Sequence, residues 1–222
     1  MIFNIQDLGS NLDFQDTWKL QENLVAQRRA GEIEDTLLLL EHTPVYTIGR
    51  TRDQSSLERR VQLPHPVVVI NRGGEGTYHG PGQLVGYAIL DLTTYKKDLH
   101  RHLRNLEEAI IRTIATFGVK AQRREGLTGV WIEERKIASL GVGVRSWVTL
   151  HGLALNVNEE SLPPFQWITP CGIDGVRMTC LEEEVGSKIS LSEVKHLLSQ
   201  YLGEVLSQEI SRNPVTTGSN NL

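Results

Sequence analysis

The segment from residue 72 to residue 83, RGGEGTYHGPGQ, constrains the fold most, because five of its last eleven residues are glycine. Glycine weakens the interior of a helix or a strand, but it lets the backbone adopt positive φ angles and approach a ligand closely. The segment therefore predicts an irregular loop. Composition leaves two interpretations open: a tight connection between two strands, or a loop that holds a ligand.

Nucleotide binding is not indicated by this loop. It lacks the GxxxxGK[ST] pattern of phosphate-binding loops, and it does not place a GxGxxG motif between a strand and a helix. The formal net charge of the chain is -4, whereas nucleic-acid-binding proteins usually carry an excess of Lys and Arg. We therefore expect no nucleic-acid partner.

Strand and helix patterns alternate on both sides of the loop. Short apolar or β-branched runs predict buried strands at residues 36–40, 45–48, 66–70, 84–92, 129–132, 136–144 and 147–157. Apolar residues spaced by three and four predict helices at residues 14–30, 99–117 and 191–205. Several strands lie at hairpin distance from one another. The pattern therefore predicts an α+β fold with a mixed, largely antiparallel sheet flanked by helices.

The length of 222 residues is sufficient for one domain with a full-sized core. Residues 1–210 contain no linker or repeat, so we expect a single domain there. Residues 211–222 are polar, and this pattern predicts a flexible C-terminal tail.

The N-terminal residues lack the basic start and apolar middle of a signal peptide, and no apolar run has the length of a membrane span. We therefore expect a cytoplasmic protein with no membrane association. In that compartment the two cysteines should stay reduced. They cannot form a four-cysteine zinc site, no His/Cys pair has zinc-finger spacing, and we expect no metal.

The segment Thr169-Pro170-Cys171-Gly172 could present a reactive thiol. Pro170 favours an extended approach to the cysteine, and Gly172 removes side-chain bulk beside the sulfur. Free cysteines are more often buried space-fillers, which is the alternative for Cys171 and the interpretation that we assign to Cys180.

Two further segments carry polar groups in a setting of small residues. Lys136 begins a strand-like run, and alternation along a strand predicts that Lys136, Ala138 and Leu140 share one face. The alternative for Lys136 is an exposed lysine at the end of a strand. His151 precedes the small-residue strand GLALNV, where it could line a pocket or be a structural histidine.

Together these segments resemble the octanoyl-(acyl-carrier-protein):protein N-octanoyltransferase family, also called lipoyl(octanoyl) transferases. The resemblance covers about residues 10–205. Its matching stretches are EHTPVYTIGR (41–50), RGGEGTYHGPGQLVGY (72–87), GVWIEERKIASLGVGVR (129–145), HGLALNV (151–157) and PCGI (170–173).

The resemblance implies a fold like the catalytic domain of biotin protein ligases and lipoate-protein ligases. It implies Cys171 as the acyl-thioester nucleophile, Lys136 as its activating partner and His151 as a possible supporting residue. The substrate contacts that it implies are Arg72, Gly73, Gly74, Glu75, Gly76, Thr77, Tyr78, His79, Ser139, Leu140, Gly141, Gly152, Leu153 and Ala154.

The activity that the resemblance implies is transfer of an octanoyl group from octanoyl-acyl carrier protein to a specific lysine of lipoyl domains. The implied acceptors are the lipoyl domains of 2-oxoacid dehydrogenases and the glycine cleavage H protein. No cofactor is implied, because thioester exchange followed by amide formation needs no ATP. Residues 50–72 carry five arginines against two acidic residues, and such a patch could attract an acidic carrier protein.

Three alternatives remain open. An ATP-dependent lipoate-protein ligase would have a lysine like Lys136 but would need no nucleophilic cysteine. A cysteine thioesterase would pass the acyl group to water. A non-catalytic acyl-binding module would use neither Cys171 nor Lys136 for chemistry.

Overall fold

The computed structural model describes residues 3–49, 63–70, 75–173 and 175–212, and of Cys171 and Arg212 it describes only the backbone. The arginine-rich segment 50–62, Arg72, Gly73 and Gly74 lie outside these residues, as does the tail from residue 213. The strands are β1 (Asn4–Leu12), β2 (Thr36–His42), β3 (Val45–Ile48), β4 (Val67–Val69), β5 (Thr77–His79), β6 (Gln83–Ile89), β7 (Gln122–Arg124), β8 (Leu127–Ile132), β9 (Arg135–Arg145), β10 (Val148–Asn156) and β11 (Arg177–Met178). The helices are α1 (Phe14–Ala30), α3 (Leu99–Ala115), α4 (Leu181–Val185) and α5 (Leu191–Arg212), with 3-10 turns at Leu92–Thr94, Glu159–Ser161, Pro163–Trp167 and Pro170–Gly172.

Two sheets organise these elements. The large sheet has the strand order β1-β2-β6-β10-β9-β8-β7, and β11 pairs with β9. Within it, β1 with β2 and β11 with β9 run parallel, and the other paired strands run antiparallel. A small sheet has the order β4-β3-β5. The α+β class with a mixed, largely antiparallel sheet is confirmed.

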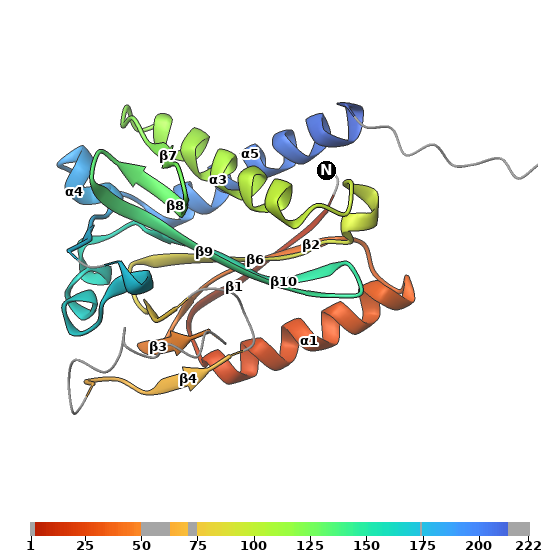
Figure 1. Ribbon diagram of the computed structural model, residues 1–222, viewed down its shortest axis with the longest axis horizontal. Coiled ribbons are helices and arrows are strands. Elements are labelled where there is room, and N and C mark those ends of the chain that lie inside the picture. The colour runs from red at the N-terminus through yellow and green to blue at the C-terminus, as the bar shows by residue number, and fades with distance from the viewer. Residues whose placement is uncertain (1–2, 50–62, 71–74, 174, 213–222) are drawn as a thin grey trace, which may run out of the picture.

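The helices cover the two faces of the large sheet (Figure 1). Helices α3 and α5 pack on one face, over a core that includes Leu37, Leu39 and Ile137. Helix α1 packs on the opposite face, over Leu38, Leu40 and Tyr87. The alternation of buried side chains along β2 thus divides one apolar run between two cores, as expected for a strand covered on both sides.

Local signals explain where α1 begins and ends. The side chain of Asp13 accepts hydrogen bonds from the backbone N–H groups of Gln15 and Asp16, at 2.8 and 3.0 Å. Gly31 ends the helix with a positive φ of 74°. Asp16 lies in the first turn, and basic residues lie in the last, in the arrangement that the helix dipole favours.

Several boundaries differ from the sequence predictions. The strand predicted at 84–92 ends at Ile89, because Asp91 accepts from the N–H of Thr93 and starts a 3-10 turn. Helix α5 includes Ser211 and Arg212, two residues of the predicted tail. Its last turns are anchored by Glu209, which forms a 2.7 Å ion pair with Arg101 of α3. Strands β1 and β7 were not predicted, since their sequences are largely polar.

Among the helices of the described residues, none combines the length and the apolar character needed to cross a bilayer.

Candidate active site

A cavity of about 250 Å³ lies where the small sheet meets the large sheet, and residues from the cores on both faces of the large sheet line it. Its walls are mainly apolar and come from α1, β5, β6, β8, β9 and β10, with Ile173 from the segment that follows Cys171. Ligand sites are commonly apolar clefts of roughly 300–1,000 Å³ with a few polar groups, so this cavity fits a small, largely apolar ligand.

Most of the predicted site residues that the structure describes line this cavity. They are Lys136, His151, Glu75, Thr77, His79, Ser139, Leu140, Gly141, Gly152, Leu153 and Ala154. Tyr78 does not, because alternation along β5 directs its side chain into a separate cluster with Tyr46, Phe165 and Ile168. Gly76 is also absent from the lining. Sequence reasoning missed Phe14, Ile70, Tyr87, Gly126, Leu127 and Thr128, which also line it.

Lys136 is buried, with 1% of its surface exposed, so it is not the exposed strand-end lysine that one interpretation predicted. Its Nζ lies 5.4 Å from the centroid of the Trp131 ring, on the neighbouring strand β8. An aromatic face attracts an ammonium ion and offsets part of the cost of removing it from water. The lysine therefore brings a shielded positive charge to the cavity wall.

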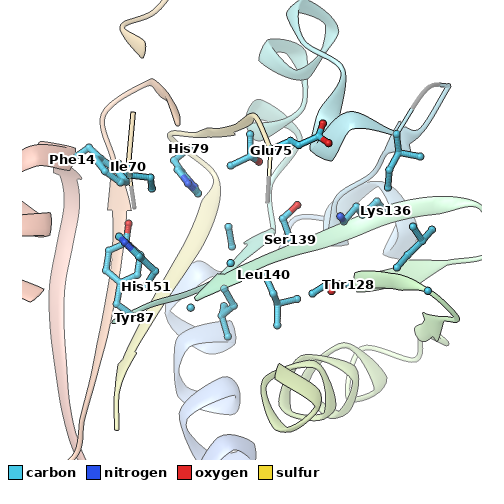
Figure 2. Close-up of a pocket in the computed structure, with 18 residues that line it drawn as sticks. Phe14, Ile70, Glu75, His79, Tyr87, Thr128, Lys136, Ser139, Leu140 and His151 are labelled. Carbon is cyan, nitrogen blue, oxygen red and sulfur yellow. The ribbon is translucent and has the colours of Figure 1, made fainter. Parts of the chain in front are cut away.

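A β-bulge determines the direction of Lys136. Trp131 is opposite Lys136 and Val130 is opposite Ala138, so Ile137 is an extra residue in β9. The predicted shared face of Lys136, Ala138 and Leu140 is therefore wrong. Lys136 and Ser139 extend to one side of β9, and Leu140 extends to the other, as Figure 2 shows.

The cysteine-containing segment is held next to Lys136 by backbone pairing. Cys171 lies in the 3-10 turn Pro170–Gly172, and Ile173 lines the same cavity as Lys136. Further along, Met178 of β11 pairs with Lys136 of β9. The N–H of Thr179 donates to the carbonyl oxygen of Lys136 at 3.0 Å. The chain that follows Cys171 is thus anchored to the strand that carries the lysine.

The glycine-rich segment contains a short strand, contrary to the sequence prediction. Residues 77–79 form β5, because this stretch has no glycine and pairs with β3, with His79 opposite Val45. Pro81 and Gly82 form the turn that follows it, with a positive φ of 76° at Gly82. The segment is therefore both a connection between strands and a wall of the cavity.

Hydrogen bonds determine which tautomer a neutral His79 ring adopts. The Gln83 side chain donates through Nε2 to the Tyr78 carbonyl and to Asn156 Oδ1, at 3.1 and 2.9 Å. Its Oε1 therefore accepts from Nδ1–H of His79, at 2.8 Å. This leaves Nε2 of the neutral ring as an acceptor, 3.4 Å from Thr47 Oγ1.

Two further aromatic groups stiffen the α1 end of the cavity. Burial lowers the pKa of His42 to about 4, so its ring is neutral at pH 7. The ring lies 3.0 Å from the Leu12 carbonyl through Nδ1 and 2.7 Å from the Tyr87 hydroxyl through Nε2. Nδ1 therefore donates and Nε2 accepts. Tyr87 in turn packs edge-on against His151, with ring centroids 6.0 Å apart.

His151 occupies a strained part of β10, with a φ of 62° that is uncommon for a non-glycine residue. Its backbone N–H donates to Gln21 Oε1 of α1, at 2.8 Å. This bond replaces a regular ladder bond and helps hold the distorted backbone in place. Within the described ranges, no group of three or more His, Cys, Asp and Glu side chains has the arrangement of a metal site.

Comparison with known proteins agrees with this fold and cavity. The model of the lipoyl protein ligase A/B catalytic domain family matches residues 13–203. An octanoyltransferase of Geotalea uraniireducens is 51% identical over 193 residues, which cover 86% of this chain and 87% of that protein. An octanoyltransferase of Geobacter sulfurreducens is 51% identical over 191 residues, covering 86% of this chain and 79% of that protein.

Solved structures resemble the fold at low sequence identity. Lipoate-protein ligase A bound with ATP has a TM-score of 0.68 and 17% identity, covering 92% of this chain and 85% of its own. A bipartite lipoate protein ligase of Thermoplasma acidophilum, described with its E2 lipoyl domain, has a TM-score of 0.65 and 18% identity, covering 92% and 85%. Biotin protein ligase of Aquifex aeolicus has a TM-score of 0.56 and 15% identity, covering 96% and 72%.

The mixed sheet, the apolar cavity and these matches define a catalytic domain of the ligase and transferase class that acts on lipoyl-type acyl groups. The chain belongs to the lipoyl protein ligase A/B catalytic domain family. Its similarity within the family is to octanoyltransferases, and it is an acyltransferase of that kind.

Proposed function

We propose that the chain moves an octanoyl group from octanoyl-acyl carrier protein to a specific lysine of lipoyl domains, through a thioester on Cys171. The observation that carries this proposal is the buried Lys136 ammonium on the wall of a small apolar cavity. Ile173, two residues beyond Cys171, lines the same cavity. The proposed role of Lys136 is to activate the thiol and to move a proton between the two half-reactions.

In the first half-reaction, the Cys171 thiolate attacks the carbonyl carbon of the carrier thioester. The new bond joins Cys171 sulfur to the acyl carbon, and the bond to the pantetheine sulfur breaks. The Lys136 ammonium favours the thiolate over the thiol, whose pKa is ordinarily about 8.5. The same ammonium then gives its proton to the departing pantetheine sulfur, which leaves Lys136 neutral.

In the second half-reaction, the amine of the acceptor lysine attacks the Cys171 thioester. An amide bond forms, the bond to Cys171 sulfur breaks, and neutral Lys136 accepts the proton that the amine loses. The enzyme returns to the paired thiolate and ammonium. Thioester exchange is close to neutral in free energy and amide formation is favourable, so the cycle requires no ATP.

The apolar walls supply a place for the acyl chain. Leu140 and Leu153 are cross-strand partners on β9 and β10, and Ala154 lies opposite Ser139 in the next position. Burial of an acyl chain against these residues stabilises the bound donor by the hydrophobic effect, about 0.8 kcal/mol for each fully buried methylene. Exclusion of water from the cavity also favours transfer to an amine over hydrolysis of the thioester.

Intact-mass measurement after mixing the protein with octanoyl-acyl carrier protein tests the proposal. We expect one adduct of about 126 Da on the wild type, the mass of an octanoyl group that replaces the proton of a reactive thiol. Cys171→Ala should carry no adduct, and Lys136→Ala should form it far more slowly. An equal adduct on Cys171→Ala would contradict the thioester mechanism.

The same assay separates the alternatives. A lipoyl domain should discharge the adduct and gain the octanoyl group without ATP. Modification of the lipoyl domain only with free octanoate and ATP would indicate a ligase. Release of octanoate at an equal rate with and without the lipoyl domain would indicate a thioesterase.

A further inference from the structure

Gly129 of β8 forms the surface over which the Lys136 side chain passes. A Cβ at position 129 would lie 2.6 Å from Lys136 Cε, 3.2 Å from its Nζ and 2.8 Å from the Ala138 carbonyl oxygen. The φ of Gly129 is 136°, a conformation that L-residues rarely adopt. The position of this backbone therefore determines where the lysine stem can lie.

The Gly129 backbone is held from the opposite side of the sheet by Glu107 of α3. The backbone N–H of Gly129 donates to Glu107 Oε1 at 3.0 Å, in a buried hydrogen bond. The other carboxylate oxygen, Oε2, accepts from Arg104 at 2.7 Å and from Arg123 at 3.1 Å. Glu107 is only 1% exposed, so the two arginines compensate its buried charge.

The strand pairing around Gly129 is irregular, and this makes the hydrogen bond from Gly129 to Glu107 important. Between β7 and β8, Arg124 is opposite Leu127 and Gln122 is opposite Trp131, with a register shift between the two pairs. A second shift, between β8 and β9, places the bulge beside Lys136. Gly129 lies inside the first irregular stretch, between Leu127 and Trp131, and one residue before the second, so the bond to Glu107 restrains a backbone whose ladder pairing is interrupted.

We propose that Glu107 is a positioning residue for Lys136: its carboxylate fixes the Gly129 backbone, and this backbone directs the lysine stem into the cavity. Glu107 does not line the cavity and acts through Gly129. The inference rests on the proposed role of Lys136. A displacement of about 1 Å in such a group can lower the rate by roughly a hundredfold.

Two substitutions separate positioning from simple ion pairing. Glu107→Asp keeps the negative charge near the arginines but withdraws the carboxylate by one methylene from the N–H of Gly129. Glu107→Gln keeps the length and an acceptor oxygen for Gly129 but removes the charge. Positioning through Gly129 predicts that the Asp variant is impaired and the Gln variant is close to wild type. If Glu107 acted only as an ion-pair partner, the Gln variant would be impaired and the Asp variant would be close to wild type.

The matched control is Glu108, the next residue of α3. It pairs with Arg112 at 3.0 Å and with Arg123 at 2.8 Å, and it does not line the cavity. Glu108→Asp therefore alters ion pairs of Arg123, which also pairs with Glu107, without touching Gly129. We expect this variant to keep the wild-type kcat and KM.

The experiment measures kcat and KM for octanoyl-acyl carrier protein, together with the melting temperature of each variant. For Glu107→Asp we expect kcat to fall by about tenfold or more, with KM within about twofold, since only the reacting group is displaced. Glu107→Gln should retain kcat within about threefold. A Gln variant that is slower than the Asp variant, or two variants equal to each other in rate, would overturn the inference.

A second measurement reports on Lys136 without turnover. The rate at which an amine-selective acylating reagent modifies Lys136, followed by peptide mass spectrometry across pH, should change in Glu107→Asp and not in Glu107→Gln or Glu108→Asp. If Lys136→Ala retained full transferase activity, the proposed function of the lysine would fail. The labelling rate of Lys136 against pH would still decide whether Glu107 positions this lysine. An unchanged rate in Glu107→Asp would refute the positioning role of Glu107.

Discussion

The carboxylate of Glu75 occupies the space that a side chain at position 172 would need, so Gly172 and Glu75 fit against each other only because residue 172 is glycine. Gly172 also has a positive φ of 65°. Glu75 comes from the glycine-rich segment and Gly172 directly follows Cys171. This contact therefore links two of the motifs that the sequence carries about 100 positions apart.

Gly172→Ala tests this link. We expect the rate of octanoyl adduct formation to fall by about tenfold or more, because the new Cβ displaces either the Glu75 carboxylate or the cysteine turn. The matched control is Gly175→Ala, which has a similar φ of 72° but no atom within 4 Å of the added Cβ. Both variants should lose about 1 kcal/mol of stability from backbone strain. Equal adduct rates in the two variants would show that the contact with Glu75 is unimportant.

Lys136→Met separates catalysis from stability. Methionine keeps most of the length of the buried stem and removes the ammonium, whose burial costs free energy. We expect octanoyl transfer to be lost, while the free energy of unfolding in urea stays equal to that of the wild type or rises by about 1 kcal/mol. Wild-type transfer by this variant would contradict the role that we propose for Lys136.

Ala154→Leu should change the preferred acyl length. Ala154 lines the cavity and is 4% exposed, so three added carbons reduce a volume of about 250 Å³. We expect the rate with octanoyl donor to fall by about tenfold or more relative to butanoyl donor, because a filled cavity excludes the longer chain. Rates for the two donors on wild type and variant measure this directly. An unchanged ratio of the octanoyl rate to the butanoyl rate would mean that the acyl chain does not bind in this cavity.

Two buried histidines make stability depend on pH. Burial lowers the pKa of His42 and of His102 to about 4, from an ordinary value of 6.5. The unfolded chain therefore takes up these protons at a higher pH than the folded protein does. The free energy of unfolding therefore has its full value above pH 6.5 and decreases as the pH falls toward 4. At pH 5 the decrease is about 2 kcal/mol for each histidine.

His102→Met removes one of the two titrating groups without disturbing the cavity. Among the described residues, neither ring nitrogen of His102 has a hydrogen-bond partner, so the substitution removes a titrating group and no polar contact. Urea unfolding at pH 7 and pH 5 should show a smaller loss of stability in the variant than in the wild type. Parallel losses in both proteins would mean that His102 does not cause the pH dependence.

Much of the fold could be predicted because its signals are local. The spacing of apolar residues that predicted helices at 14–30 and 99–117 depends on neighbours within a few positions. Edge strands β1 and β7 could not be predicted, since their largely polar sequences become strands only by pairing with a more apolar neighbour. The strand at Thr77–His79 was missed because it depends on pairing with β3.

The sequence by itself determined the family, the main helices and the chemical identity of the proposed pair, because motifs and short-range patterns lie in residues close together in the chain. Only the tertiary structure decided how Lys136 is used. The extra residue in β9 turns its side chain to the face of Ser139, Trp131 shields it, and Glu107 holds the glycine over which it passes. These contacts join residues from three separate elements, and a one-residue change in strand register reverses which face a side chain occupies.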